Sequence, residues 1–199
     1  MPLKLDLSQT LLLRESAGGY LAVQLALSHP SDIQALVALY PVLDPRSKFY
    51  TTSYEKPMHG IWNRLVSIVD YHIASLQSAL SGQRLVVTEA DPLNCLQQSY
   101  AVVQHGWYLD FLGQDRELFP IERFMDSASS EDSDGDRNIP PVFIFHGKDD
   151  TFEPYQGTLR FVEALGKTHP FAKYRWEIQP GDHRFDADAN IKHTPWLKE

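Results

Sequence analysis

The sequence lacks most of the features that mark secreted, membrane-spanning and nucleotide-binding proteins. Cys95 is the only cysteine among 199 residues, which excludes an internal disulfide. No apolar run approaches the ~18 residues that are needed to span a membrane. The chain has neither a glycine-rich phosphate loop nor the spaced glycines of a dinucleotide-binding fold. The sequence therefore predicts a globular protein without a nucleotide site.

Positive charge is also scarce. With 18 basic and 26 acidic residues the formal net charge is −8, which argues against binding to nucleic acid or to an anionic membrane surface. Lys4 and Asp6 interrupt the start of the chain, so no signal peptide is predicted and we expect a cytoplasmic protein. No spacing typical of metal ligands is present, and we expect neither a metal nor a cofactor.

The sequence does contain an alternation of strand-like and helical segments. Hydrophobic residues make up 43% of the chain and aromatic residues 12%, which is typical of a single globular domain over residues 1–199. Strands are predicted at 11–13, 33–40, 142–145 and 174–179, and helices at 17–28 and 156–165, with Gly166 just beyond the second helix. A strand, a helix and a strand at this spacing imply parallel pairing. We therefore predict an α/β fold with a mainly parallel sheet, whose last strand alternates and forms a half-exposed edge.

The middle of the chain breaks this alternation. Apolar residues recur every three or four positions over residues 62–80 and again over 96–111, which predicts two amphipathic helices, the second capped by Gly113. We predict that these helices belong to a cap, or lid, inserted at about 44–125. A polar and acidic stretch at about 126–138 has too little apolar content to pack, so we expect a surface loop there.

Three aromatic residues of the predicted cap have two possible roles. Trp62, Trp107 and Phe111 could line a pocket for the acyl part of a substrate. Their helical spacing is more often that of side chains that pack in a core. The sequence leaves both roles open.

Ser16 stands where an apolar run ends and a helical pattern begins. A strand that turns sharply into a helix at a serine is typical of a nucleophile elbow, which holds the hydroxyl out of the chain. The small residues Gly18 and Gly19 give strand and helix room to approach each other. The backbone N–H of Ala17 could then face a developing oxyanion. The alternative is that Ser16 only caps the helix, since serine is favoured at that position.

Two later loops supply the residues that could activate this serine. Asp149 and Asp150 follow one apolar strand, and His183 follows another through Pro-Gly. The resulting order of serine, acid and histidine is the order found in α/β-hydrolases. The spacing favours Asp150 over Asp149 as the acid, and the structural role expected for His146 is a hydrogen bond within its own turn.

Three segments resemble the fold-3 group of α/β-hydrolases, which is similar to the carboxylesterases of the hormone-sensitive-lipase type. The segments are E-S-A-G-G-Y-L-A, H-G-x-D-D-x-x-x-P and P-G-x-H-x-F-D, and the resemblance spans Ser16 to Asp186. It implies that Ser16 is the nucleophile, His183 the base and Asp150 the acid that orients the base, with Ala17 as an oxyanion donor. It also implies a small-molecule ester as substrate and no cofactor.

The chain departs from that pattern in two places. Arg14 replaces the first glycine of G-x-S-x-G, and we expect its side chain to crowd the elbow. The His-Gly-Gly-Gly segment, which precedes the serine in this group and supplies further oxyanion donors, is absent. We therefore expect the C-terminal portion of a hydrolase. The alternative to an active carboxylesterase is a catalytically impaired fragment or pseudoenzyme.

Overall fold

The computed structural model describes residues 6–63, 67, 70–71, 74, 99–129, 139–190 and 192–195. The chain forms two compact units. One, which we call the sheet unit, comprises Met1–Asp44 and Asp115–Glu199, and the other, the inserted unit, comprises Pro45–Gln114. Among the described residues, no helix is long and apolar enough to cross a membrane.

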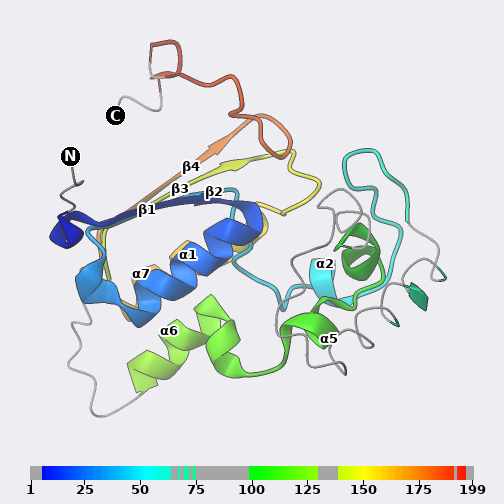
Figure 1. The fold of residues 1–199 in the computed structure, drawn as a ribbon, viewed down its shortest axis with the longest axis horizontal. Helices are drawn as coiled ribbons and strands as arrows, with labels where there is room; N and C mark the ends of the chain where they lie inside the picture. Colours follow the sequence, from blue (N-terminus) through cyan, green and yellow to red (C-terminus); the bar gives the residue numbers. More distant parts are fainter. Residues whose placement is uncertain are drawn as a thin grey trace, which may run out of the picture. The chain divides into compact units, whose positions relative to one another are not determined.

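The sheet unit is built on four parallel strands that lie side by side in chain order (Figure 1). The strands are β1 (Leu11–Glu15), β2 (Ala35–Leu39), β3 (Val142–Gly147) and β4 (Tyr174–Gln179). This arrangement confirms the predicted α/β class. It also confirms that β4 is an edge strand. Because all four strands run the same way, their carboxyl ends meet at one edge of the sheet.

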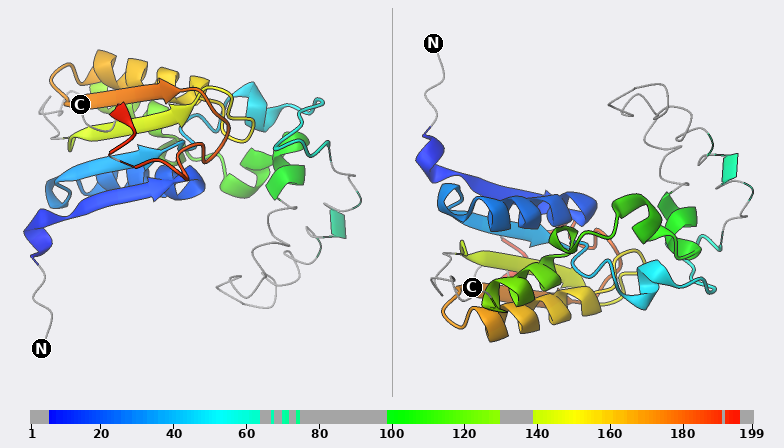
Figure 2. Two further views of the ribbon diagram at one scale, coloured as in Figure 1. Left: turned by 90° about the horizontal axis from the view of Figure 1, so that it is seen from above. Right: turned by 90° about the horizontal axis from the view of Figure 1, so that it is seen from below.

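Three helices of the sheet unit cover one face of the sheet (Figure 2). They are α1 (Ser16–Ser28), α6 (Pro120–Ser129) and α7 (Gln156–Thr168), and short 3₁₀ turns lie at η1 (Leu7–Gln9), η2 (Pro30–Asp32) and η3 (Arg116–Leu118). Alternate strand residues such as Leu36 and Ile144 point into the core beneath these helices. The segment after β4 passes over the opposite face, on which Leu11 and Leu13 are 57% and 52% exposed.

The end of α7 differs from the prediction. The helix does not stop before Gly166 but continues to Thr168, with His169 as its C-cap. A Cβ at Gly166 would lie 2.4 Å from the hydroxyl of Tyr174 on β4. The glycine therefore permits the helix and the strand to approach closely and does not end the helix.

The boundary of the insertion also differs from the prediction. The inserted unit ends at Gln114, and α6 belongs to the sheet unit because Phe124 packs on Phe161 of α7, with 5.1 Å between ring centroids. This burial carries the helix into the acidic stretch that was predicted to be a loop, of which 126–129 are helical. Residues 130–138 lie outside the described part of the chain.

The inserted unit contains α2 (Lys48–Thr51), a helical stretch at 99–104 and α5 (Tyr108–Leu112). The single helix predicted over 96–111 is therefore interrupted. Gly106, at the break, has a φ of 75°, and a Cβ there would lie 2.7 Å from the backbone of Thr52. Gly113 caps α5 as predicted, because its amide donates to the carbonyl of Leu109 at 2.9 Å. The helix predicted over 62–80 falls largely outside the described residues.

The buried side chain of Lys56 links two helical segments of the inserted unit by hydrogen bonds. The ammonium group of Lys56 donates to the carbonyls of Thr52 at 2.9 Å and Val103 at 2.8 Å, and also to that of Phe49. These carbonyls lie at the ends of α2 and of the helical stretch 99–104, where the backbone has no further helical partner. Burial lowers the pKa of Lys56 to about 8.

Candidate active site

Ser16 lies at the sharp junction between β1 and α1. Its φ is 52°, in the left-handed region that few residues other than glycine adopt. Strained backbone of this kind is concentrated at functional sites. Glu15, in extended conformation, occupies the N-cap position of α1, and Ser16 is the first helical residue, so the interpretation of Ser16 as a capping residue does not hold. Ala17 follows in the first turn, where helix geometry leaves the N–H without an intrahelical acceptor.

The two glycines after the serine have different roles. A Cβ on Gly19 would lie 2.7 Å from the ring of Pro41, so only glycine fits there without displacement. A Cβ on Gly18 would make ordinary contact, at 3.6 Å, with the side chain of Arg14. Arg14 is exposed and donates to the carbonyl of Leu13 at 3.0 Å. Its side chain therefore lies along Gly18 at an ordinary contact distance and does not crowd the turn.

Asp150 and His183 meet at the carboxyl ends of β3 and β4. The Nδ1 atom of His183 lies 2.8 Å from Oδ2 of Asp150, whose side chain is fully buried. The other carboxylate oxygen of Asp150 accepts the backbone N–H groups of Phe152 and Glu153 at 2.8 and 2.7 Å. Both oxygens of the carboxylate are thus held by donors.

These contacts determine the ionisation of Asp150. Burial opposes the charged form, but hydrogen bonds from His146 and His183, the charge of the His183 ring and the backbone N–H of Glu153 together outweigh it. The pKa of Asp150 is therefore held well below its usual range. An ionised Asp150 accepts the proton on Nδ1 of His183, which leaves Nε2 of the same ring as the free base.

Asp149 and His146 stabilise the surrounding loops. Asp149 accepts the N–H of Gly181 at 3.0 Å through its side chain and donates its own N–H to the carbonyl of Gly181 at 2.9 Å. The ring of His146 is buried between the hydroxyl of Thr158, at 2.9 Å, and the carbonyl of Glu153, at 2.6 Å. This confirms the role expected for His146 within its turn.

Asp182 also belongs to this loop framework. One of its carboxylate oxygens, Oδ1, accepts the N–H of Thr151 and the N–H of His183, each at 2.8 Å. It thereby links the loop after β3 to the loop after β4. The sequence favoured a solvated loop carboxylate for this residue over a metal ligand, and its role in joining the two loops carries no local signal.

Tyr40 connects the serine side of the site to the histidine side. It follows β2 with a φ of 38° and is 1% exposed. Its ring packs edge-on against the ring of His183, with 4.6 Å between centroids, and its hydroxyl donates to Oε2 of Glu15 at 2.6 Å. Since Glu15 directly precedes Ser16, one side chain contacts both the histidine and the neighbour of the serine. No local pattern indicates this role, because Tyr-Pro after a strand is ordinary.

The three candidate pocket aromatics lie in the inserted unit. Trp62 and Phe111 are 63% and 46% exposed. Trp107 is half-buried and packs against Ala101 and Val102. A contact of any of the three with substrate stays a prediction.

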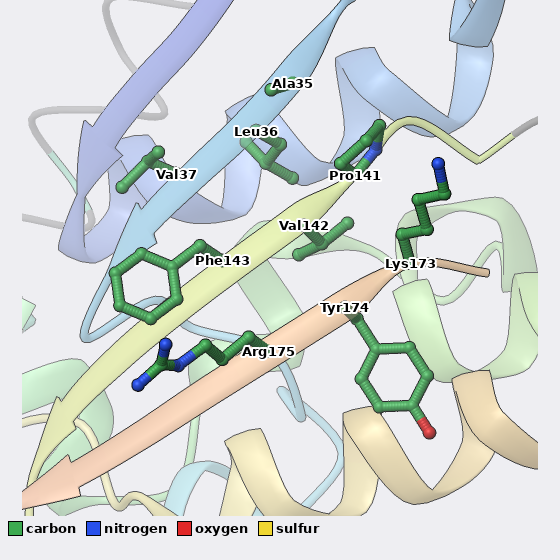
Figure 3. Close-up of a pocket in the computed structure, with 9 residues that line it drawn as sticks. All are labelled: Ala35, Leu36, Val37, Pro141, Val142, Phe143, Lys173, Tyr174 and Arg175. Carbon is green, nitrogen blue, oxygen red and sulfur yellow. The ribbon is translucent and has the colours of Figure 1, made fainter. Parts of the chain in front are cut away.

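A hollow on the sheet lies away from the candidate site. It encloses about 310 Å³ and is lined by the first residues of β2, β3 and β4 and those just before them (Figure 3). The lining residues are Ala35, Leu36, Val37, Pro141, Val142, Phe143, Lys173, Tyr174 and Arg175. Open parallel sheets bind ligands at the opposite, carboxyl ends of their strands. In the described part of the chain, no group of three histidine, cysteine or acidic side chains is placed to hold a metal ion.

Known proteins and solved structures are similar to this chain in sequence and in fold. The chain is similar to "Probable carboxylesterase M8" of Phoma sp. (strain ATCC 20986 / MF5453), with 27% identity over 196 residues, which cover 98% of this chain and 58% of that protein. No protein-family model matches the sequence. Among solved structures, a protein of unknown function from Staphylococcus aureus Mu50 superposes with a TM-score of 0.54 at 17% identity, over 92% of this chain and 59% of the other.

An acylaminoacyl peptidase from Pyrococcus horikoshii superposes with a TM-score of 0.51 at 13% identity, over 94% of this chain and 22% of the peptidase. The fold is that of an α/β-hydrolase. The chain spans somewhat more than half the length of its carboxylesterase relative.

Proposed function

We propose that this chain carries the catalytic residues of a serine hydrolase of the carboxylesterase type. The observation that carries the proposal is the 2.8 Å hydrogen bond between His183 and a buried, ionised Asp150, at the sheet edge where Ser16 forms its sharp turn. The similarity to a carboxylesterase along nearly the whole chain supports the same reaction class. The substrate would be a small-molecule ester.

The proposed reaction follows from the roles of these groups. Nε2 of His183 takes the proton of the Ser16 hydroxyl as the oxygen attacks the ester carbonyl. Asp150 keeps the proton of the imidazole on Nδ1 and stabilises the imidazolium that forms. The N–H of Ala17 stabilises the charge that develops on the carbonyl oxygen. His183 returns the proton to the leaving alcohol, and water then hydrolyses the acyl group from Ser16.

The proposal is tested with two reagents. An alkyl fluorophosphonate reports whether Ser16 is activated, because it reacts once with a nucleophilic serine and needs no turnover. Hydrolysis of p-nitrophenyl acetate reports complete turnover. Ser16→Ala should abolish both signals, whereas Ser53→Ala, at an exposed position in the inserted unit, should change neither. Equal phosphonate labelling of the unsubstituted protein and of Ser16→Ala would refute the proposal.

A second candidate is a hydrolase fold with impaired catalysis. The 199 residues contain no His-Gly-Gly-Gly segment, which supplies oxyanion donors in the group that the chain resembles. Loss of a single oxyanion donor lowers kcat by about 10²–10³. In this case the phosphonate labels Ser16, but ester turnover does not exceed that of Ser16→Ala. The cap over Ser16 and the cytoplasmic location stay predictions.

A further inference from the structure

The ring of His183 is restrained by more than its hydrogen bond to Asp150. That bond joins Nδ1 to the carboxylate at 2.8 Å, but a single hydrogen bond leaves an imidazole free to rotate about the contact. Two aromatic rings limit this rotation. The ring of Tyr40 lies 4.6 Å from that of His183 between centroids, with an interplanar angle of 62°, and the ring of Phe152 lies 5.1 Å away, at 41°. The direction in which Nε2 points therefore depends on how these two rings are fixed.

Tyr40 is the more firmly anchored of the two rings. It is 1% exposed, whereas Phe152 is half-buried and lies on the same loop as Asp150. The backbone N–H of Tyr40 donates to the carbonyl of Phe145 on β3 at 2.7 Å, and its hydroxyl donates to Oε2 of Glu15 on β1 at 2.6 Å. Both ends of the residue are thus fixed to neighbouring strands of the sheet.

The backbone at Tyr40 is strained in the same way as the backbone at the proposed nucleophile. Four described residues other than glycine have a positive φ. Three of them belong to this site, since Ser16 follows β1, Tyr40 follows β2 and Arg184 follows His183, whereas His59 lies in the inserted unit. Such a conformation costs free energy and persists only where the surroundings hold it. The strain at Tyr40 is therefore part of how the site is built.

The hydroxyl of Tyr40 remains a donor over the usual pH range. Burial raises the pKa of Tyr40, and the hydrogen bond to Glu15 and the negative charges of Asp186 and Glu15 raise it further. The charge of Arg184 opposes this rise without cancelling it. Glu15 is exposed, so water can solvate its carboxylate when the hydroxyl is removed. Removal of the hydroxyl therefore tests the position of the ring without leaving a buried charge.

We propose that Tyr40 is a positioning residue for the proposed base. Its hydroxyl, held by Glu15, fixes the ring, and the ring fixes the plane of the His183 imidazole so that Nε2 points toward Ser16. Because Glu15 directly precedes Ser16, the same side chain also ties the base to the turn that carries the nucleophile. The inference deepens the proposed function and rests on it.

The first test compares phosphonate labelling in two variants that each lose one buried hydroxyl. Tyr40→Phe keeps the ring, and it should label Ser16 about tenfold more slowly because the base is misplaced. The matched control is Tyr20→Phe, since Tyr20 is also buried in the sheet unit and its hydroxyl donates to the carbonyl of Leu118 at 2.8 Å. Both variants should lose a similar amount of thermal stability, but the control should label like the unsubstituted protein. Equal slowing in both variants, or none in Tyr40→Phe, would overturn the proposal.

The second test asks whether Tyr40 acts through Glu15. Glu15→Ala should slow labelling about as much as Tyr40→Phe, and the double variant should be no slower than either one, because each removes the same hydrogen bond. Glu15→Gln should label faster than Glu15→Ala, since its amide oxygen accepts the same proton. In the slowed variants the maximal labelling rate should fall while the half-saturating phosphonate concentration stays the same. Additive losses in the double variant would contradict the proposed link.

A third measurement needs no reaction at Ser16. The proton on Nδ1 of His183 bonds to a carboxylate, and such a proton gives a far-downfield NMR signal that is sharp when the ring is held in place. The signal should broaden in Tyr40→Phe and stay sharp in Tyr20→Phe, and a sharp signal in both would refute the role of Tyr40. If the unsubstituted protein is not labelled at all, the proposed function fails, while this signal still decides whether Tyr40 positions the ring.

Discussion

Replacement of Asp150 by asparagine tests the orientation of the candidate base. The two backbone N–H groups of Phe152 and Glu153 point at Oδ1 of Asp150, at 2.8 and 2.7 Å. In Asp150→Asn these fixed donors require the amide oxygen at that place, so the NH₂ group must face Nδ1 of His183. The histidine then carries its proton on Nε2 and cannot accept the proton of Ser16.

The expected loss is large. A wrong imidazole tautomer with unchanged geometry lowers kcat by about 10³–10⁴. The matched control is Asp149→Asn, because an asparagine oxygen can still accept the N–H of Gly181 that Asp149 accepts at 3.0 Å. We expect this control to remain within about threefold of the unsubstituted protein.

The assay is the rate of phosphonate labelling, and the rate of Ser16→Ala gives the background. The labelling rate of Asp150→Asn should fall to about that background. The reverse ranking of the two substitutions would move the acid to Asp149. A loss of less than tenfold in Asp150→Asn would refute the argument that the backbone donors fix the amide.

Four further outcomes can be measured on the same protein. Gly19→Ala should destabilise it by about 1–3 kcal/mol through the contact with the Pro41 ring, whereas Gly18→Ala should be neutral or stabilising, as urea unfolding will report. Because the pKa of Asp150 is lowered, its ionised form stabilises the fold above pH ~4. The melting temperature of the unsubstituted protein should therefore fall more steeply below that pH than the melting temperature of Asp150→Asn. Because the pKa of Lys56 is lowered to about 8, the unfolded chain binds more protons above that pH, so stability relative to Lys56→Met should rise up to pH ~10.4. The exposed apolar edge at β1 should cause concentration-dependent association in light scattering, and strictly monomeric protein at high concentration would contradict this.

The sequence by itself determined the strands of the sheet and the order of the candidate catalytic residues. Each strand is a short apolar or alternating run, and that pattern is local, so the predicted β4 coincides with the observed strand. Parallel pairing follows from the helices between strands, and it brings Ser16, Asp150 and His183 to one edge of the sheet. The position of each residue after a strand was therefore visible without a structure.

Only the tertiary structure decided what surrounds those residues. Glycine is common just after a helix, so Gly166 suggests a helix end in the sequence. In the structure a glycine is needed there because the hydroxyl of Tyr174, on β4, leaves no room for a side chain. Tyr40 lies 25 positions from Glu15 in sequence, and their hydrogen bond depends on how the ends of β1 and β2 meet. Such contacts join distant residues of ordinary type, so no local pattern in the sequence records them.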